Sequence, residues 1–280
     1  MGRLDQKTAV ITGGTRGIGF AIAQAFAAEG AAVVIASRSA ESVERAVEQL
    51  RSAGRRASGM ALDVGDLGQV KALAQHAVGT FGGFDIWINN AGVGGPYGPT
   101  VELTAEAFSR VVQTNILGTY YGSRTAMRNF LLRGQGKLIN LVGHGAKEIV
   151  PFQSAYASSK SWVRSFTLAL AKETQGSGVS VMTFQPGMVR TELLTGGQVI
   201  AGHEDKLSRF PRVIELLAKS PEKAAEKVVW AASAATDGKT GLEVTAGSNW
   251  RMLLAALRSA LGKKVEPVEV HICSVPPAED

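Results

Sequence analysis

Tyr156 and Lys160 are the residues of this sequence whose types and spacing most directly indicate acid–base chemistry. They stand four apart where the chain begins a helical pattern, so both side chains would lie on one face of that helix. A tyrosine hydroxyl with a pKa near ~10 exchanges protons poorly at neutral pH, whereas a neighbouring ammonium group stabilises the phenolate and lowers that pKa. The alternative is a tyrosine packed in the core beside a solvated lysine. Because Tyr-x-x-x-Lys recurs by chance, the rest of the chain must decide.

The composition indicates a globular α/β protein. The 280 residues are 45% hydrophobic, with 33 glycines and 9 prolines, which is sufficient for a sizeable core. No apolar run approaches the ~18 residues of a membrane span, and the N-terminus lacks the apolar core of a signal peptide. Cys273 is the only cysteine, which excludes an intramolecular disulfide and gives no metal-ligand cluster. We therefore expect a cytoplasmic protein without a metal ion.

The charge is mildly basic, at +6 with a sequence pI of about 9.5. The basic residues are scattered, and no pattern of stacked aromatic and basic residues indicates nucleic-acid binding. A phosphate-rich cofactor explains the charge equally well, so we expect a small-molecule substrate and neither a nucleic-acid nor a membrane partner.

Alternating strands and helices are the elements that must position these residues. Strands that are apolar along their whole length form parallel sheets covered by helices on both faces, connected by right-handed crossovers. The pattern therefore predicts one Rossmann-type, doubly wound α/β domain over 1–248, with a seven-stranded parallel sheet flanked by helices. The expected strands are 7–12, 31–37, 57–64, 84–92, 137–143, 180–187 and 241–247; the expected helices are 20–29, 39–53, one ending at Phe81, 104–133, 155–174 and 220–235.

Two segments depart from this alternation. Residues 191–220 are irregular and mix glycines with charged residues, which is typical of a mobile substrate lid. Residues 249–280 form a C-terminal extension with an amphipathic helical pattern over 249–264 and a strand-like run, Val268–Val275. The extension could close over a neighbouring subunit's site, lengthen an oligomer interface or pack on its own subunit; attachment to a membrane surface is the weakest interpretation.

A glycine-rich turn over Thr12–Gly19 lies between the first strand and the first helix. Its glycines allow the backbone to approach a pyrophosphate, to which the helix N-terminus offers N–H donors and a favourable dipole. The second strand ends in Ser37-Arg38, without the carboxylate that commonly holds the ribose diol of NAD. Arg38 and Arg16 suit a 2′-phosphate, unless both are simply solvated. The turn therefore predicts a dinucleotide site, and NADP(H) is favoured.

Taken together, these motifs resemble the short-chain dehydrogenase/reductase family over essentially residues 5–247. The resemblance covers Thr12–Gly19, Asn89-Asn90-Ala91-Gly92, Asn115, Tyr156-x-x-x-Lys160 and Pro186-Gly187, in the family's order and approximate spacing.

The resemblance implies that Tyr156 is the general acid, that Lys160 also bonds the nicotinamide ribose, and that Asn115 holds a proton-relaying water. It further implies that Asn89 braces the sheet and the cofactor, and that homodimers, commonly paired into homotetramers, form through the long helix and the Tyr156 helix. From the glycine turn, the end of the second strand and the resemblance, the expected cofactor-binding residues are Gly13, Thr15, Arg16, Gly17, Ile18, Gly19, Ser37, Arg38, Asp63, Val64, Asn90, Ala91, Gly92, Tyr156, Lys160, Pro186, Gly187, Val189 and Thr191.

One family position differs. The serine that normally stands thirteen residues before the tyrosine is Gly143 here, and losing such a donor costs roughly 2–4 kcal/mol of transition-state stabilisation. Three explanations stay open: His144 or Ser154 supplies the missing catalytic hydrogen bond, the glycine makes room for a bulkier substrate, or ordinary carbonyl reduction has been lost.

The sequence thus predicts an NADP(H)-dependent oxidoreductase that interconverts a ketone or aldehyde and an alcohol. The alternative is an NADP(H)-binding sensor or structural protein with little turnover, which Gly143 favours and the retained Asn115, Tyr156 and Lys160 oppose. A dehydratase or isomerase on the same scaffold is a third, weaker possibility.

Overall fold

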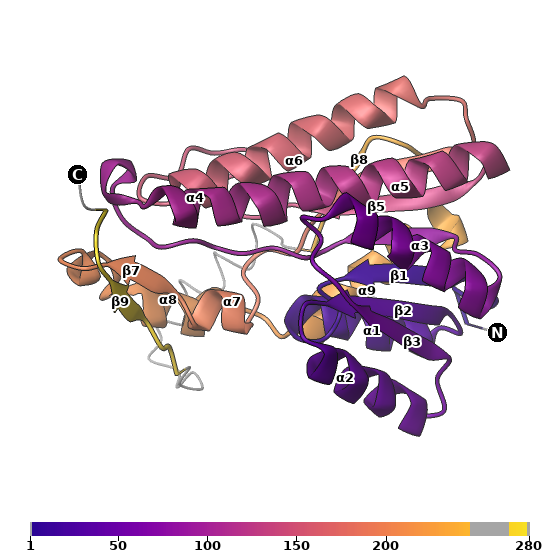
Figure 1. Cartoon of the computed structure of the whole chain (residues 1–280), viewed down its shortest axis with the longest axis horizontal. Coiled ribbons are helices and arrows are strands. Elements are labelled where there is room, and N and C mark those ends of the chain that lie inside the picture. Colours follow the sequence, from indigo (N-terminus) through magenta and orange to yellow (C-terminus); the bar gives the residue numbers. More distant parts are fainter. Residues whose placement is uncertain (1, 247–268, 279–280) are drawn as a thin grey trace.

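The computed structural model describes residues 2–246 and 269–278. Its centre is a seven-stranded, entirely parallel sheet with the strand order β3-β2-β1-β4-β5-β6-β8, which confirms the expected fold (Figure 1). The strand order reverses between β1 and β4, the place where parallel α/β sheets open a crevice for ligands. The strands are β1 (Thr8–Thr12), β2 (Ala32–Ser37), β3 (Ala57–Ala61), β4 (Ile86–Asn89), β5 (Gly136–Leu141), β6 (Val179–Gln185) and β8 (Leu242–Thr245).

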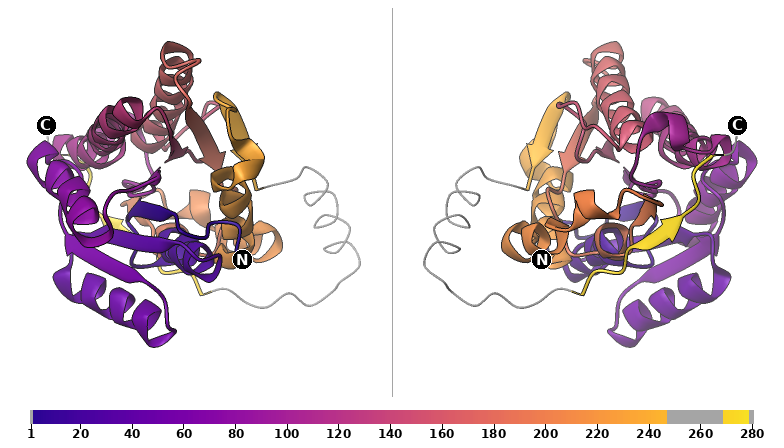
Figure 2. Two further views of the ribbon diagram at one scale, coloured as in Figure 1. Left: turned by 90° about the vertical axis from the view of Figure 1, so that its right-hand side faces the viewer. Right: turned by 90° about the vertical axis from the view of Figure 1, so that its left-hand side faces the viewer.

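Helices cover both faces of this sheet, as Figure 2 shows. Successive strand residues point to opposite faces, so Ala9 and Ile11 join one buried cluster while Val10 joins the other. The first cluster includes residues of α1 (Gly17–Ala28), α2 (Ala40–Ser52) and α9 (Pro221–Ala232); the second includes residues of α3 (Leu67–Phe81), α5 (Gly118–Arg133) and α6 (Ser154–Glu173).

The helix expected over 104–133 contains a break in its regular winding. It begins as α4 (Ala105–Val111), where Thr104 caps the first turn by accepting a hydrogen bond from the Ala107 N–H at 3.2 Å. A π-helical turn, η2 (Val112–Leu117), then leads into α5. Single π turns inside α-helices occur frequently at functional sites, and this one carries Asn115.

The segment 191–220 folds into short elements: α7 (Glu192–Thr195), β7 (Gln198–Ile200), η3 (Glu204–Leu207) and α8 (Phe210–Leu217). The strand-like run near the C-terminus yields a shorter strand, β9 (Cys273–Val275), which pairs with β7 in a separate parallel sheet. The helix expected over 249–264 lies outside the described residues. Two 3₁₀ turns complete the description: η1 (Thr100–Glu102) and η4 (Ala234–Thr236).

Candidate functional site

The glycine turn is fastened to the end of β4 by a set of hydrogen bonds. The Thr12 hydroxyl donates to Ile88 O at 3.3 Å and accepts from the backbone N–H groups of Asn90 and Ala91, at 3.1 and 3.2 Å. The Asn90 amide donates to the carbonyl oxygens of Thr12 and Gly13, both at 2.9 Å. Asn90 and Ala91 therefore shape the turn from outside it.

The turn itself fits a pyrophosphate. Gly13 and Gly17 have φ values of +64° and +53°, which favour glycine. A Cβ at Gly19 would lie 2.1 Å from Gly13 O, so the start of α1 packs against the turn without room for a side chain. The result is a cradle of bare backbone at a helix N-terminus, the arrangement that binds phosphate groups. Thr15 and Ile18 are half-buried within it.

Two of the residues expected to select the cofactor, Ser37 and Arg38, lie next to this turn. Gly14 N–H donates to Ala36 O at 3.1 Å, which places Ser37 and the exposed Arg38 beside the glycines. Asp63, after β3, is exposed and accepts a hydrogen bond from the backbone of Gly65 at 2.8 Å.

Two further expected cofactor residues make contacts elsewhere. Arg16 forms an ion pair with Glu192 of α7, and both side chains are largely exposed. Val64 is buried against α5, where a Cβ at Gly118 would lie 2.6 Å from its Cγ2.

The segment after β6 reaches back to the glycine turn. Gly187 adopts a φ of +73° directly after Pro186, and Val189 is buried and bridges to Lys219. The methyl group of Thr191 would lie 3.1 Å from a Cβ at Gly17. Thr191 therefore packs against the glycine turn at Gly17.

Asn115 is the centre of the second part of the site. It is completely buried; its Oδ1 accepts from Val93 N–H at 2.9 Å, and its Nδ2 donates to Val93 O and to the Ser159 hydroxyl, both at 3.0 Å. Ser159, which sequence reasoning missed, in turn donates to Tyr156 O at 2.7 Å. The only signal for Ser159 was its place three residues after Tyr156. The π turn thereby joins the loop after β4 to α6.

Tyr156 and Lys160 lie on the face of α6 directed at the end of β5. Lys160 Nζ donates to Leu141 O at 3.2 Å and lies 5.7 Å from the centroid of the Tyr156 ring. A Cβ at Gly92 would lie 3.3 Å from Asn115 Oδ1 and 3.5 Å from Lys160 Nζ. Asn115 and Lys160 therefore meet beside Gly92.

The acid–base properties differ from the expectation that Lys160 lowers the pKa of Tyr156. Burial raises the pKa of Tyr156 to about 12, and burial lowers the pKa of Lys160 to about 8. Desolvation disfavours the charged form of each group. Burial is the cause of both shifts and raises the pKa of Tyr156, so that expectation is wrong in direction.

Gly143 leaves no empty space at the missing serine. A Cβ built on Gly143 would lie 2.4 Å from Tyr156 Oη, so the tyrosine hydroxyl lies where a serine side chain would have to start. His144 is 63% exposed and lies 3.2 Å from Glu148, whereas the Ser154 hydroxyl accepts from Thr100 at 2.9 Å. Among the described residues, neither one hydrogen-bonds to Tyr156, and their catalytic roles stay predictions.

Asn89 belongs to a buried polar network behind the site. Its Oδ1 accepts from the Trp87 indole at 2.9 Å, and its Nδ2 donates to Asn140 Oδ1 at 2.8 Å. A Cβ at Gly122 would lie 2.0 Å from Asn89 Oδ1. The network joins β4, β5 and α5 behind the loop that carries Asn90.

In the part of the chain that the structure describes, no group of three His, Cys, Asp or Glu side chains could hold a metal ion. Across residues 2–246 and 269–278, no helix has both the length and the apolar character needed to cross a membrane.

Comparison with known proteins identifies the family. Residues 7–197 match the model of the short chain dehydrogenases. The chain is 33% identical over 246 residues to the probable chlorophyll(ide) b reductase NYC1 of Arabidopsis thaliana, with 81% of this chain and 48% of that protein covered. This chain therefore spans about half of the length of that relative.

Two solved structures share nearly the whole fold. One is a 3-ketoacyl-(acyl-carrier-protein) reductase from Brucella melitensis complexed with NADH, with a TM-score of 0.77, 30% identity and coverage of 86% of this chain and 97% of that one. The other is a variant of actinorhodin polyketide ketoreductase with NADPH, with a TM-score of 0.78, 28% identity and coverage of 85% and 95%. The chain belongs to the short-chain dehydrogenase family.

Proposed function

We propose that this protein is an NADP(H)-dependent oxidoreductase that interconverts a ketone or aldehyde and an alcohol. The observation that carries the proposal is the meeting of Lys160 and Asn115 beside Gly92, with the Tyr156 ring 5.7 Å from Lys160 Nζ, at the end of the strands that also hold the glycine turn. Asn115 lies in the π turn η2, whereas Tyr156 and Lys160 lie in α6, so a packing role alone gives no reason for the two segments to bring these residues together next to a phosphate cradle.

Tyr156 acts as the general acid in the direction of reduction. Its hydroxyl is protonated at neutral pH, because burial raises the pKa of Tyr156, and in the reaction it would donate this proton from Oη to the carbonyl oxygen as negative charge develops there. When bound, the nicotinamide cofactor supplies the hydride for reduction or accepts it in oxidation. Burial lowers the pKa of Lys160 to about 8, so its ammonium group gives up a proton more readily than that of an exposed lysine, and a water held by Asn115 would relay protons to Lys160.

The residues that would hold the cofactor are those of the glycine turn and its neighbours. Gly13, Gly17 and Gly19 would form the pyrophosphate cradle, against which Thr191 packs; Pro186, Gly187 and Val189 would hold the nicotinamide end. Known similar structures contain NADH in one case and NADPH in another, so they do not decide between the two. The preference for NADP(H) rests on Ser37 and Arg38 beside the cradle and on the lack of an Asp or Glu at the end of β2.

An alternative function is that of an NADP(H) sensor with little turnover. Gly143 favours it, because the site lacks the serine that normally donates a second hydrogen bond to the substrate oxygen.

We further propose a cytoplasmic homodimer or homotetramer that pairs through α5 and α6. Tyr120 on α5 is 39% exposed and packs edge-on against Phe166 of α6, which stacks on Trp162. This aromatic surface is shared by the two helices through which the expected pairing runs.

The decisive experiment measures NADPH consumption with a panel of ketones and aldehydes in the wild type and in Tyr156→Phe. We expect turnover in the wild type, and a loss of at least a hundredfold in Tyr156→Phe under conditions in which the fluorescence of bound NADPH shows that the variant is saturated with cofactor. NADPH binding without turnover in the wild type would favour the sensor. Equal turnover in both proteins would exclude Tyr156 as the acid.

A further inference from the structure

Residues 269–278, which we call the tail, run along the substrate segment 191–220 and pair with it. The backbone N–H of His271 donates to Thr195 O at 2.7 Å, that of Cys273 donates to Gly197 O at 3.1 Å, and Ala201 N–H donates to Val275 O at 2.9 Å. Figures 1 and 2 show the yellow tail beside the orange strand β7. Three backbone bonds thus follow one another along the same stretch of the substrate segment.

Strand β7 is also paired on its other edge. Tyr97 N–H donates to Gln198 O at 2.8 Å, and Ile200 N–H donates to Tyr97 O at 2.9 Å. Val199 therefore stands between Tyr97 and Ser274, and it is completely buried. Three segments far apart in the sequence form one small sheet: the loop after β4, the substrate segment and the tail.

This small sheet is connected to the catalytic residues. Its inner member, Tyr97, stacks on Phe152 with 5.6 Å between the ring centroids, and Gly98 N–H donates to Phe152 O at 2.9 Å. Phe152 adopts a φ of +64°, a strained value for a bulky residue, and it precedes Tyr156 by four residues. The same loop begins at Val93, which Asn115 holds through both backbone groups.

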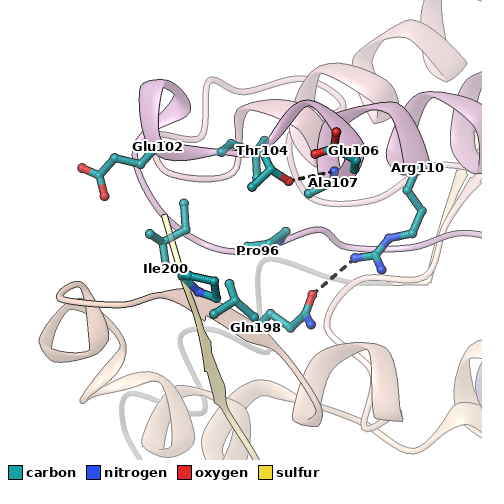
Figure 3. Close-up of a pocket in the computed structure, with 11 residues that line it drawn as sticks. Pro96, Glu102, Thr104, Glu106, Ala107, Arg110, Gln198 and Ile200 are labelled. Carbon is teal, nitrogen blue, oxygen red and sulfur yellow. Dashed lines mark hydrogen bonds between the residues drawn. The ribbon is translucent and has the colours of Figure 1, made fainter. Parts of the chain in front are cut away.

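The tail is anchored on its outer side as well. The Ser274 hydroxyl donates to Glu204 at 2.6 Å, and Ala278 N–H donates to Glu102 O at 2.9 Å. Between the tail and α4 lies a groove of about 320 Å³, shown in Figure 3, across which Arg110 donates to Gln198 at 3.3 Å. The apolar residues that line the groove are Pro96, Leu103, Ala107, Ile200, Val275 and Pro276.

We propose that the tail is a positioning element for substrate binding, an inference that rests on the proposed function. A three-residue strand such as β7 gains little stability alone. Pairing on both edges stabilises this strand, and the paired strand in turn holds Tyr97 and Phe152 in position near Tyr156. The tail makes none of the cofactor contacts described above, so its loss should weaken substrate binding and spare NADPH binding.

The test variant removes two backbone N–H donors of the tail together with their side chains, and the control removes only the same two side chains. Proline lacks the N–H group, so His271→Pro with Cys273→Pro abolishes the bonds to Thr195 and Gly197. The matched control is His271→Ala with Cys273→Ala, which keeps both N–H groups. Thermal unfolding of both variants establishes that the main sheet is intact, and a chain without residues 269–280 serves as a second, complete loss of the tail.

We expect the amides of Ile200 and Ala201 to exchange hydrogen at least tenfold faster in the proline variant than in the alanine control. KM for the carbonyl substrate should rise at least fivefold, with the dissociation constant of NADPH within twofold of wild type. Unchanged exchange in both the proline variant and the truncated chain would overturn the proposal, as would faster exchange with an unchanged KM.

Hydrogen exchange does not require turnover, so this experiment separates the two ideas. Absence of any turnover in the wild type would refute the proposed function. The positioning role would then be tested by the hydrogen-exchange rates and by the affinity of the proline variant for the carbonyl compound, each compared with the alanine control. An exchange rate or an affinity equal to that of the control would overturn the proposal.

Discussion

Gly143→Ala and Gly143→Ser test whether the glycine is required by Tyr156. Ordinary contacts of a Cβ begin at 3.4 Å, whereas a Cβ at position 143 would lie 2.4 Å from Tyr156 Oη. The backbone of Gly143 is not in the left-handed region, so either side chain can be built there. The hydroxyl of Tyr156 must then move by about 1 Å, and displacements of that size can cost ~100-fold in rate.

We therefore expect kcat/KM for a carbonyl substrate to fall about 100-fold in Gly143→Ala, equivalent to about 2.7 kcal/mol. Gly143→Ser imposes the same displacement but adds a donor, so its activity should lie between Gly143→Ala and wild type. The assay is steady-state NADPH oxidation, with NADPH affinity and thermal unfolding measured alongside. Gly79→Ala is the matched control, because nothing lies within 4 Å of its added Cβ.

Two results would refute this reasoning. Gly143→Ala within twofold of wild type would mean that Tyr156 does not need the space. Gly143→Ser more active than wild type would mean that the ordinary serine geometry is compatible with this site, and that the missing donor limits the wild-type enzyme.

The remaining predictions concern a buried charge, a packed glycine and the cofactor. Burial lowers the pKa of Lys160 from 10.5 to about 8, so between these two pH values the unfolded chain binds more protons than the folded chain. Relative to Lys160→Met, the unfolding free energy of the wild type, measured by urea unfolding, should therefore rise by about 2 kcal/mol from pH 7.5 to pH 10. Parallel plots of unfolding free energy against pH for the two proteins would contradict this prediction. Gly122→Ala places a Cβ 2.0 Å from Asn89 Oδ1 and should lower the unfolding free energy by about 2 kcal/mol. The control Gly79→Ala should raise the unfolding free energy by about 0.5–1 kcal/mol. Equal changes in the two variants would show that close packing of Gly122 against Asn89 does not determine stability. Arg38→Ala should reduce the preference for NADPH over NADH about tenfold, and an unchanged ratio of dissociation constants would disprove the role of Arg38.

The parallel sheet could be predicted because each strand carries its own local signal. The run 31–36, for example, is apolar throughout and follows Gly30, and Ser220-Pro221 marks the start of α9 as expected. The π turn could not be predicted, because the apolar spacing over 104–133 fits a regular helix. What holds the turn is tertiary: the bonds of Asn115 to Val93 and Ser159.

The identities of the site residues could be predicted, because the chemistry requires particular residue types. The properties that depend on distances between side chains in the folded chain could not. Spacing alone gave the pairing of Tyr156 with Lys160, but the direction of their pKa shifts depends on burial, which a single sequence does not reveal. The contact of Gly143 with the Tyr156 hydroxyl and the pairing of β9 with β7 depend on chain segments meeting in space. Both were beyond any local pattern.

Because of the π turn, the number of residues in the long helix, and not only their types, sets how α4 is rotated relative to α5. Each residue advances an α-helix by ~100°, so a deletion within Val112–Leu117 that restored regular winding would turn α4 by about that angle relative to α5. Arg110 and Ala107 would then leave the groove, and Asn115 would leave Val93. Residues 112–117 should therefore accept many substitutions but almost no insertions or deletions, because a change in length would move the groove residues of α4 out of register with Asn115 and with α6.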